Sequence, residues 1–147
     1  MASTLNRVPA HTSEDINQKI RDDIAANVRY YSAYNDQIPH RLRELEEEWD
    51  IERAIEANAS ALAFTGIVLG ATGHRRWLIL PAMVTAFLFQ HAIQGWCPPI
   101  PILRRLGFRT AHEIEIERNA LKAIRGDYAA VSKSVDNSTA ALSAAHS

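Results

Sequence analysis

The chain has 147 residues, with 16 Lys and Arg against 17 Asp and Glu, and a formal net charge of −1. This length fits one domain, and the balanced charge argues against a general polyanion binder, so no nucleic-acid partner is expected. The single cysteine excludes a disulfide framework within the chain and metal sites of the CxxC type.

The N-terminal third of the sequence predicts two amphipathic helices. Residues 1–12 mix Pro, Ser, Thr and Asn without periodicity and are expected to be flexible. Over residues 13–50, apolar side chains recur at helical spacing in two stretches, and the second helix is expected to continue unbroken into the apolar segment. The two stripes are Ile16, Ile20, Ile24, Val28 and Tyr31, then Leu42, Leu45, Trp49 and Ile55.

The middle of the chain contains two long uncharged runs. Residues 57–73 carry no Lys, Arg, Asp or Glu over 17 positions, and residues 77–103 carry none over 27. A membrane-spanning helix needs about 20 mostly apolar residues. Trp77 and Trp96 bracket the second run at roughly 28 Å along a helix, close to the hydrocarbon thickness, and tryptophan favours bilayer interfaces. The runs predict a two-span transmembrane helical hairpin. A buried hairpin in a soluble four-helix bundle is the alternative.

Small residues form a stripe along the first run. In lipid, such a stripe allows two helix backbones to approach closely and to pack by dispersion. We therefore predict that it packs helices together and supports a homo-oligomer, with Ala82 and Ala86 of the second run as a facing pair. The stripe consists of Ala59, Ala63, Gly66 and Gly70.

The distribution of arginine predicts the orientation of the hairpin. Two arginines lie at its tip and six lie near its terminal side, which by the positive-inside rule places both termini in the cytoplasm. No signal peptide is visible within the first 50 residues. The tip carries Arg75 and Arg76, and the terminal side carries Arg41, Arg43, Arg53, Arg104, Arg105 and Arg109.

Polar residues cluster at the end of the second span. Gln90, His91 and Gln94 form a candidate intramembrane site, since polar groups there face a partner helix or a cavity. An interhelical hydrogen bond or interfacial hydration is the simpler interpretation. Ligation of a metal or haem by His91 would need a second ligand from another copy, so no metal and no cofactor are predicted.

Prolines at positions 98, 99 and 101 end this helix near Trp96, and the chain is expected to turn along the membrane surface. Ile102, Leu103, Leu106 and Phe108 would then enter the interface, while Arg104, Arg105 and Arg109 face phosphates. Cys97 lies directly after the helix end and is a candidate thiol. It is either reactive, with help from Arg104 or Arg105, or an inert packing residue.

The order of a short apolar helix, a tip, a longer apolar helix, Gly95-Trp96-Cys97-Pro98 and then Leu106-Gly107 resembles the YgaP-like transmembrane domain. This family comprises small bacterial inner-membrane proteins, some fused to a cytoplasmic rhodanese. The resemblance covers residues 51–109. It implies a bacterial inner-membrane hairpin that dimerises through its helices, with a link to sulfur or thiol chemistry through Cys97 alone. The chain has no rhodanese active-site loop, because its one cysteine lies in the membrane motif.

The C-terminal side begins with a capping box formed by Thr110 and Glu113. It predicts a cytoplasmic helix over residues 110–131 that packs on the N-terminal helices. Residues 132–147 are rich in Ser, Ala and Asn and predict a disordered tail. The apolar stripe of this helix is Ile114, Leu121, Ile124, Tyr128 and Val131.

The overall prediction is an all-α fold, a two-span transmembrane helical hairpin with amphipathic cytoplasmic helices on both flanks. No catalytic residues are predicted, because the chain has no Gly-rich phosphate loop, no GxSxG and no HExxH, and the acidic cluster at 44–52 spreads over several helix faces. The leading hypothesis is a non-enzymatic scaffold in the lipid bilayer that oligomerises and binds a cytoplasmic protein partner. The alternatives are a membrane-surface thiol or sulfur relay or redox sensor using Cys97, and a small oligomeric pore lined by Gln90, His91 and Gln94.

Overall fold

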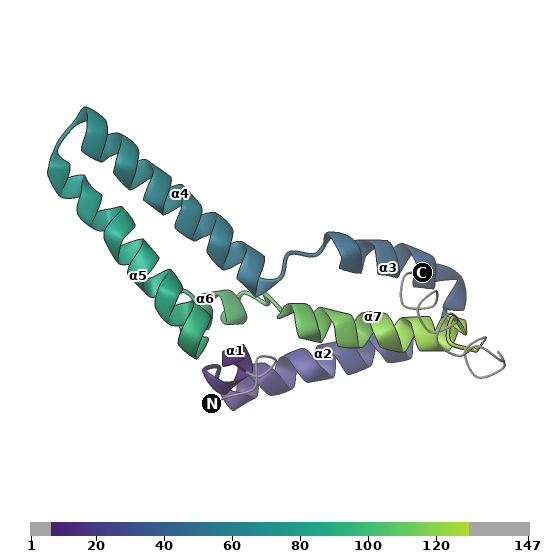
Figure 1. The fold of residues 1–147 in the computed structure, drawn as a ribbon. Coiled ribbons are helices and arrows are strands. Elements are labelled where there is room, and N and C mark those ends of the chain that lie inside the picture. The colour runs from purple at the N-terminus through teal and green to yellow at the C-terminus, as the bar shows by residue number, and fades with distance from the viewer. Residues whose placement is uncertain (1–6, 130–147) are drawn as a thin grey trace, which may run out of the picture. The chain divides into compact units, whose positions relative to one another are not determined.

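The computed structural model describes residues 7–129, and every regular element within them is a helix (Figure 1). The all-α prediction is therefore confirmed for this part of the chain. The described residues divide into two compact units. The first comprises positions up to 20 together with 49–112, and the second comprises 21–48 together with positions from 113. The predicted tail, 132–147, lies outside the described residues, as do the first six positions of the predicted flexible segment.

The first unit is built around two long helices, α4 and α5, which lie side by side in opposite directions (Figure 1). They are joined by a tight turn and a short 3₁₀ helix, Arg75–Leu78. At 1.5 Å per residue, the 22 residues of α4 extend over roughly 33 Å. The elements of this unit are α1 (Arg7–Ala10), the start of α2 (Glu14–Ala33), α4 (Ile51–Thr72), α5 (Ile79–Gln94) and α6 (Ile100–Arg105).

A short non-helical segment, which was not predicted from the sequence, separates α3 (Ile38–Glu47) from α4, and α4 begins at Ile51. α3 ends where Glu48 adopts an extended conformation, and Asp50 then caps the next helix by accepting a hydrogen bond from the Arg53 backbone N–H at 2.6 Å. The N–H of Ile51 donates to the carbonyl of Arg109 at 2.8 Å. These partners stabilise a separate helix start, so the expectation of one continuous helix is wrong.

The core of the first unit lies where α4 begins and α5 ends. α1, which falls in the segment expected to be flexible, contributes Val8 to this core. The partly buried Phe87, Leu88, Leu103 and Phe108 pack against it. The buried members are Val8, Ile51, Ile55, Cys97 and Ile100.

The second unit packs the remainder of α2 with α3 and α7 (Ala111–Arg125). Its core joins apolar residues of α3 and α7, with Tyr31 of α2 partly buried against them. Tyr31 and four of the five buried members belong to the stripes expected from the sequence. The buried members are Ile38, Leu42, Leu45, Ile114 and Leu121.

Candidate functional site

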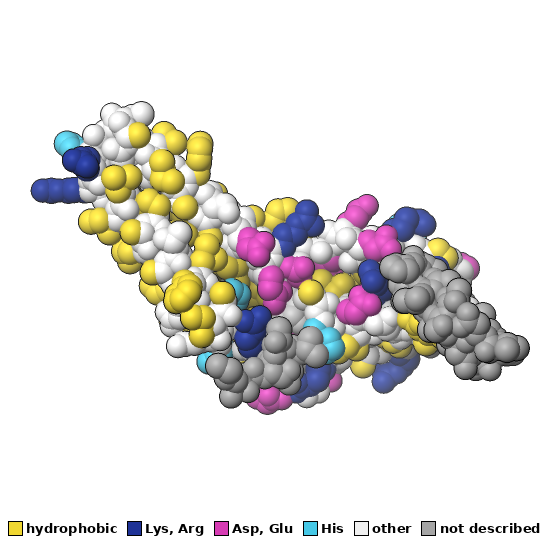
Figure 2. Space-filling view, viewed as in Figure 1, with side chains coloured by type: hydrophobic (Ala, Val, Ile, Leu, Met, Phe, Trp, Pro, Cys, Tyr) yellow, Lys and Arg dark blue, Asp and Glu magenta, His cyan; other side chains and the backbone are white. Residues whose placement is uncertain are grey.

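An exposed apolar band on α4 and α5 is the most prominent surface feature of the first unit. The described chain has two helical stretches that are long and apolar enough to cross a membrane, one within 35–72 and the other Arg75–Gln94. No residue in the apolar window of the second stretch is buried. Figure 2 shows hydrophobic side chains covering this helix pair, with basic side chains at its tip. Among the exposed residues are Leu62, Phe64, Ile67, Val68, Trp77, Leu78, Ile79, Met83, Phe89 and Ile93.

The stripe of small residues holds α4 against α5 of the same chain. Gly66 and Gly70 are buried, and a Cβ on Gly66 would lie 2.5 Å from Cδ of Pro81. A Cβ on Gly70 would lie 2.6 Å from Cδ2 of Leu78. The predicted facing pair is wrong: Ala82 and Ala86 are exposed, and Leu78, Leu80 and Pro81 supply the contacts instead. The buried Ala59 and the half-buried Ala63 complete the stripe.

The three polar residues at the end of α5 do not converge on one point. Gln94 is exposed and accepts a long hydrogen bond of 3.5 Å from the Gln90 amide. The Nδ1 atom of the half-buried His91 is itself buried and has no hydrogen-bond partner among the described residues. The described residues also contain no group of three His, Cys, Asp or Glu side chains that could hold a metal ion.

The N-terminal segment caps the end of α5. Arg7 Nη1 donates to the carbonyl of Ala92 at 2.6 Å, and His11 Nε2 lies 3.2 Å from the carbonyl of Gln94. The last carbonyls of a helix have no partner within it, so these side chains satisfy groups that would otherwise need water. Gly95 ends the helix with a φ of 73°, and the Cβ and backbone of Arg7 pack so closely on it that a side chain there would clash. Sequence reasoning missed Arg7 and His11.

Cys97 is a core residue of the first unit. Its side chain is 5% exposed and packs in the cluster that contains Val8, Ile51 and Ile100. Burial raises the pKa of the Cys97 thiol above its ordinary value, because an apolar environment disfavours the thiolate. The thiolate is the nucleophile in thiol chemistry, so this environment favours the inert form.

We expect Cys97 to react slowly with maleimide in the folded protein. At neutral pH its rate should fall at least about tenfold below that of the same chain unfolded in denaturant, since burial lowers both access and thiolate fraction. Because the pKa is raised, the folded-state rate should continue to increase at pH values above the range where the unfolded thiol levels off. Mass spectrometry of quenched time points measures both rates. Equal rates at neutral pH would contradict a packing role.

Arg104 and Arg109 are buried, so the expectation that they face phosphates is wrong. Arg104 is 1% exposed, and its Nη2 donates to Oδ1 of Asn17 at 2.9 Å. Its Nη1 donates to the carbonyl of Phe108 at 3.3 Å. The bond to Asn17 links α6 to the start of α2. Asn17 in turn donates to the carbonyl of Pro9 in α1 at 3.0 Å. Arg105 remains exposed.

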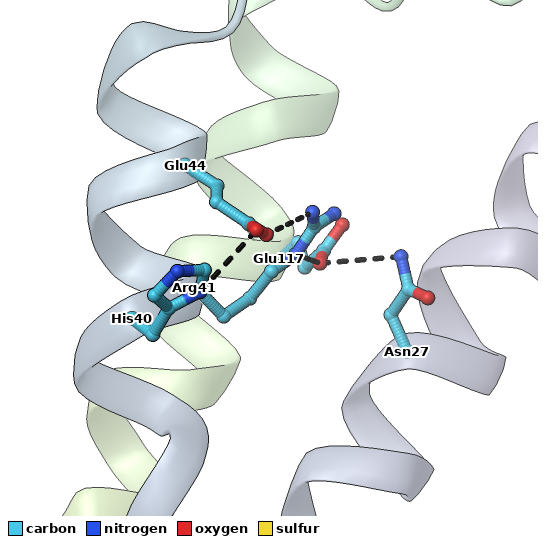
Figure 3. A network of polar contacts seen from close by, with 5 residues as sticks. All are labelled: Asn27, His40, Arg41, Glu44 and Glu117. Carbon is cyan, nitrogen blue, oxygen red and sulfur yellow. Dashed lines mark hydrogen bonds and ion pairs between the residues drawn. The ribbon is translucent and has the colours of Figure 1, made fainter.

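A polar network around the buried Glu117 joins the three helices of the second unit (Figure 3). Glu117 of α7 is 0% exposed, and its Oε1 accepts hydrogen bonds from Arg41 Nε at 2.8 Å and from Asn27 Nδ2 at 3.3 Å. Arg41 also pairs with Glu44 at 3.0 Å, and Glu44 lies 3.3 Å from Nδ1 of His40. Burial alone would lower the pKa of Arg41, but its hydrogen bonds to Glu117 and Glu44 outweigh this and raise it. The network fixes α3 and α7 against α2.

Comparison of the chain with known proteins finds no relative. No protein-family model, curated protein or solved structure matches it. The resemblance of residues 51–109 to the YgaP-like family therefore stays a prediction that depends on the residues quoted for it.

Proposed function

We propose that this chain is an integral membrane protein in which α4 and α5 cross the bilayer as a hairpin. The observation that carries the proposal is the stretch Arg75–Gln94, which is apolar and has no buried residue in its apolar window. The core helix of a soluble bundle would be mostly buried, and soluble proteins rarely expose contiguous apolar patches above a few hundred Å². In a bilayer the same side chains face lipid, and helices satisfy their backbone groups internally.

The proposed topology places both termini in the cytoplasm of a bacterium and the tip of the hairpin outside. Arg75 and Arg76 are the only Lys or Arg residues of the tip, and the terminal side has six arginines nearby. The second unit suits water, because charged side chains of both signs gather on its visible face (Figure 2). Its helices would form the amphipathic cytoplasmic flanks of the membrane hairpin.

The role that these features support best is a non-enzymatic scaffold whose cytoplasmic unit binds a protein partner. A groove of about 480 Å³ between α2 and α7 supports partner binding, since Ile24, Val28 and Ile116 give it an apolar floor. The small-residue stripe is already occupied by α5, so an oligomer formed through it would have to exchange α5 for a helix of a second copy. The burial of Cys97 and the dispersed polar residues of α5 give no support to a thiol relay or a pore.

The first experiment is an alkaline carbonate wash of membranes from cells that express the full chain. We expect the protein to stay in the pellet, because two spans are removed only by detergent. In a Cys97→Ala background, His74→Cys should react with an impermeant maleimide in intact cells. Asn119→Cys should react only after permeabilisation. Release of the protein by carbonate would contradict membrane integration, and labelling of Asn119→Cys in intact cells would contradict the orientation.

A further inference from the structure

An apolar groove of about 390 Å³ opens on the first unit where α4, α5 and α6 meet. α4 contributes Ile55 and Leu62, α5 contributes Val84 and Phe87, and the turn before α6 contributes Cys97. The small side chain of Ala59 forms part of the wall and leaves room between the helices. Ile102 of α6 lines the edge and is 63% exposed, so the groove is open on that side.

The lining of the groove indicates the chemistry of its occupant. It contains no Lys, Arg, Asp, Glu or His side chain. Its one amide, Asn58, donates through Nδ2 to the carbonyl of Ala54 in its own helix at 2.7 Å. Cys97 belongs to the apolar core cluster. A polar ligand would leave its own groups unsatisfied there, whereas a hydrocarbon chain would lose nothing.

We propose that the groove holds an acyl chain of a membrane phospholipid. This inference rests on the proposed function, because its location between spanning helices places the groove beside bilayer hydrocarbon. An apolar groove in that position stays dry, and its walls lose their dispersion contacts if no other group fills it. Lipid chains are the abundant apolar species there. They are about as apolar as leucine, so retention depends on packing within the groove and not on escape from water.

The edge of the groove also suits the head group of such a lipid. Arg105 follows Ile102 by three residues on α6, so the two exposed side chains share a helix face. A chain seated against Ile102 would therefore leave its phosphate near a guanidinium. Basic residues at the cytoplasmic interface attract the phosphates of anionic lipids.

Photocrosslinking of the full chain in vesicles tests this proposal. The vesicles contain phosphatidylethanolamine and phosphatidylglycerol, with a trace of phosphatidylcholine that carries a diazirine in mid-chain. After irradiation, peptide mass spectrometry locates the adducts. We expect adducts on the groove residues, near Ile55, Leu62 and Ile102, to exceed those on Phe89 and Ile93 by about tenfold, the ratio that 1.4 kcal/mol of binding gives.

Two variants fill the groove and one serves as a matched control. Ala59→Phe places a ring in the wall of the groove. Ile102→Trp blocks its edge from an exposed position, where a larger side chain does not disturb folding. Each should reduce groove adducts to the level found on Phe89. Ala61→Phe adds the same ring to an exposed position of α4 and should leave the groove adducts unchanged.

The outcomes separate this inference from the proposed function. Equal adducts on all lipid-facing residues, in protein that resists carbonate extraction, would overturn the acyl-chain site and leave the membrane hairpin intact. With the photoreactive residue benzoylphenylalanine in place of Ile102, crosslinks between two protein chains would overturn it in favour of a second copy as the occupant. Release by carbonate would overturn both proposals together.

Discussion

Replacing Gly66 with leucine is expected to force α4 away from α5. A Cβ at this position would lie 2.5 Å from Cδ of Pro81 and 3.1 Å from Cβ of Leu80, and the proline ring cannot rotate aside. Overpacking of this kind costs typically about 1–3 kcal/mol, and a leucine extends further than the Cβ alone. The double variant Gly66→Leu with Gly70→Leu should be affected more strongly, because Leu78 lies 2.6 Å from a Cβ at position 70.

Thermal unfolding followed by circular dichroism in detergent micelles measures the loss of stability. Spin labels at Ala61→Cys and Ala86→Cys, in a Cys97→Ala background, measure the separation of α4 and α5. Thr65→Leu is the matched control, because Thr65 is the exposed neighbour of Gly66 on the same helix. Equal stability of Gly66→Leu and Thr65→Leu would contradict packing within the chain. If Gly66→Leu only reduced crosslinking between chains, the stripe would belong to an oligomer interface.

Removal of Arg41 should be the most destabilising single change in the second unit. The Arg41 side chain is 18% exposed and its Nε lies 2.8 Å from the fully buried Glu117 carboxylate. Arg41→Leu would leave that carboxylate buried without its guanidinium, a change that costs about 3–5 kcal/mol for buried pairs. Arg43→Leu removes the same charge from an exposed position of α3 and should have little effect.

A double variant measures how far the contributions of Arg41 and Glu117 to stability depend on each other. Arg41→Leu combined with Glu117→Leu should recover most of the stability lost in Arg41→Leu, because the Glu117 carboxylate is then no longer left buried without its guanidinium partner. Hydrogen exchange of α3 and α7 amides in the full chain reports on this unit separately from α4 and α5. Strictly additive losses in the double variant would show that Arg41 and Glu117 do not depend on each other.

The membrane-length helices could be predicted because the signal is compositional. Runs of 17 and 27 residues without Lys, Arg, Asp or Glu need no knowledge of tertiary contacts. The burial of Glu117 is also partly indicated by its position in the sequence. This residue lies between Ile114 and Leu121 at spacings of three and four residues, which places it on the buried face of α7. Glutamate is seldom buried without a partner, however, and the partner Arg41 lies 76 residues away in the sequence, so local spacing alone does not predict the burial of Glu117.

The polar anchors of the first unit could not be predicted from local patterns. Arg104 finds Asn17 at a sequence separation of 87 residues, and Arg7 finds Ala92 at a separation of 85. From the sequence alone, an arginine close to an apolar segment predicts a contact with a lipid phosphate as readily as a contact with a distant residue of the same chain. The break before α4 was missed for a related reason: Asp50 lies in a run of acidic residues and becomes a cap only through its position.

The contact between Arg7 and the end of α5 has a consequence for the order of assembly. Ribosomes add about 5–20 residues per second, so roughly 4–17 s separate the synthesis of Arg7 from that of its acceptor Ala92. In the proposed topology, α4 and α5 leave the ribosome and enter the bilayer during that interval, before the acceptor carbonyls reach their final position. Val8 and Asn17 are likewise made well before the residues that they contact, Cys97 and Arg104. Within the first unit, α1 and the start of α2 are therefore made first and dock last. In the proposed topology, insertion of the hairpin sets the rate at which this N-terminal segment reaches its final position.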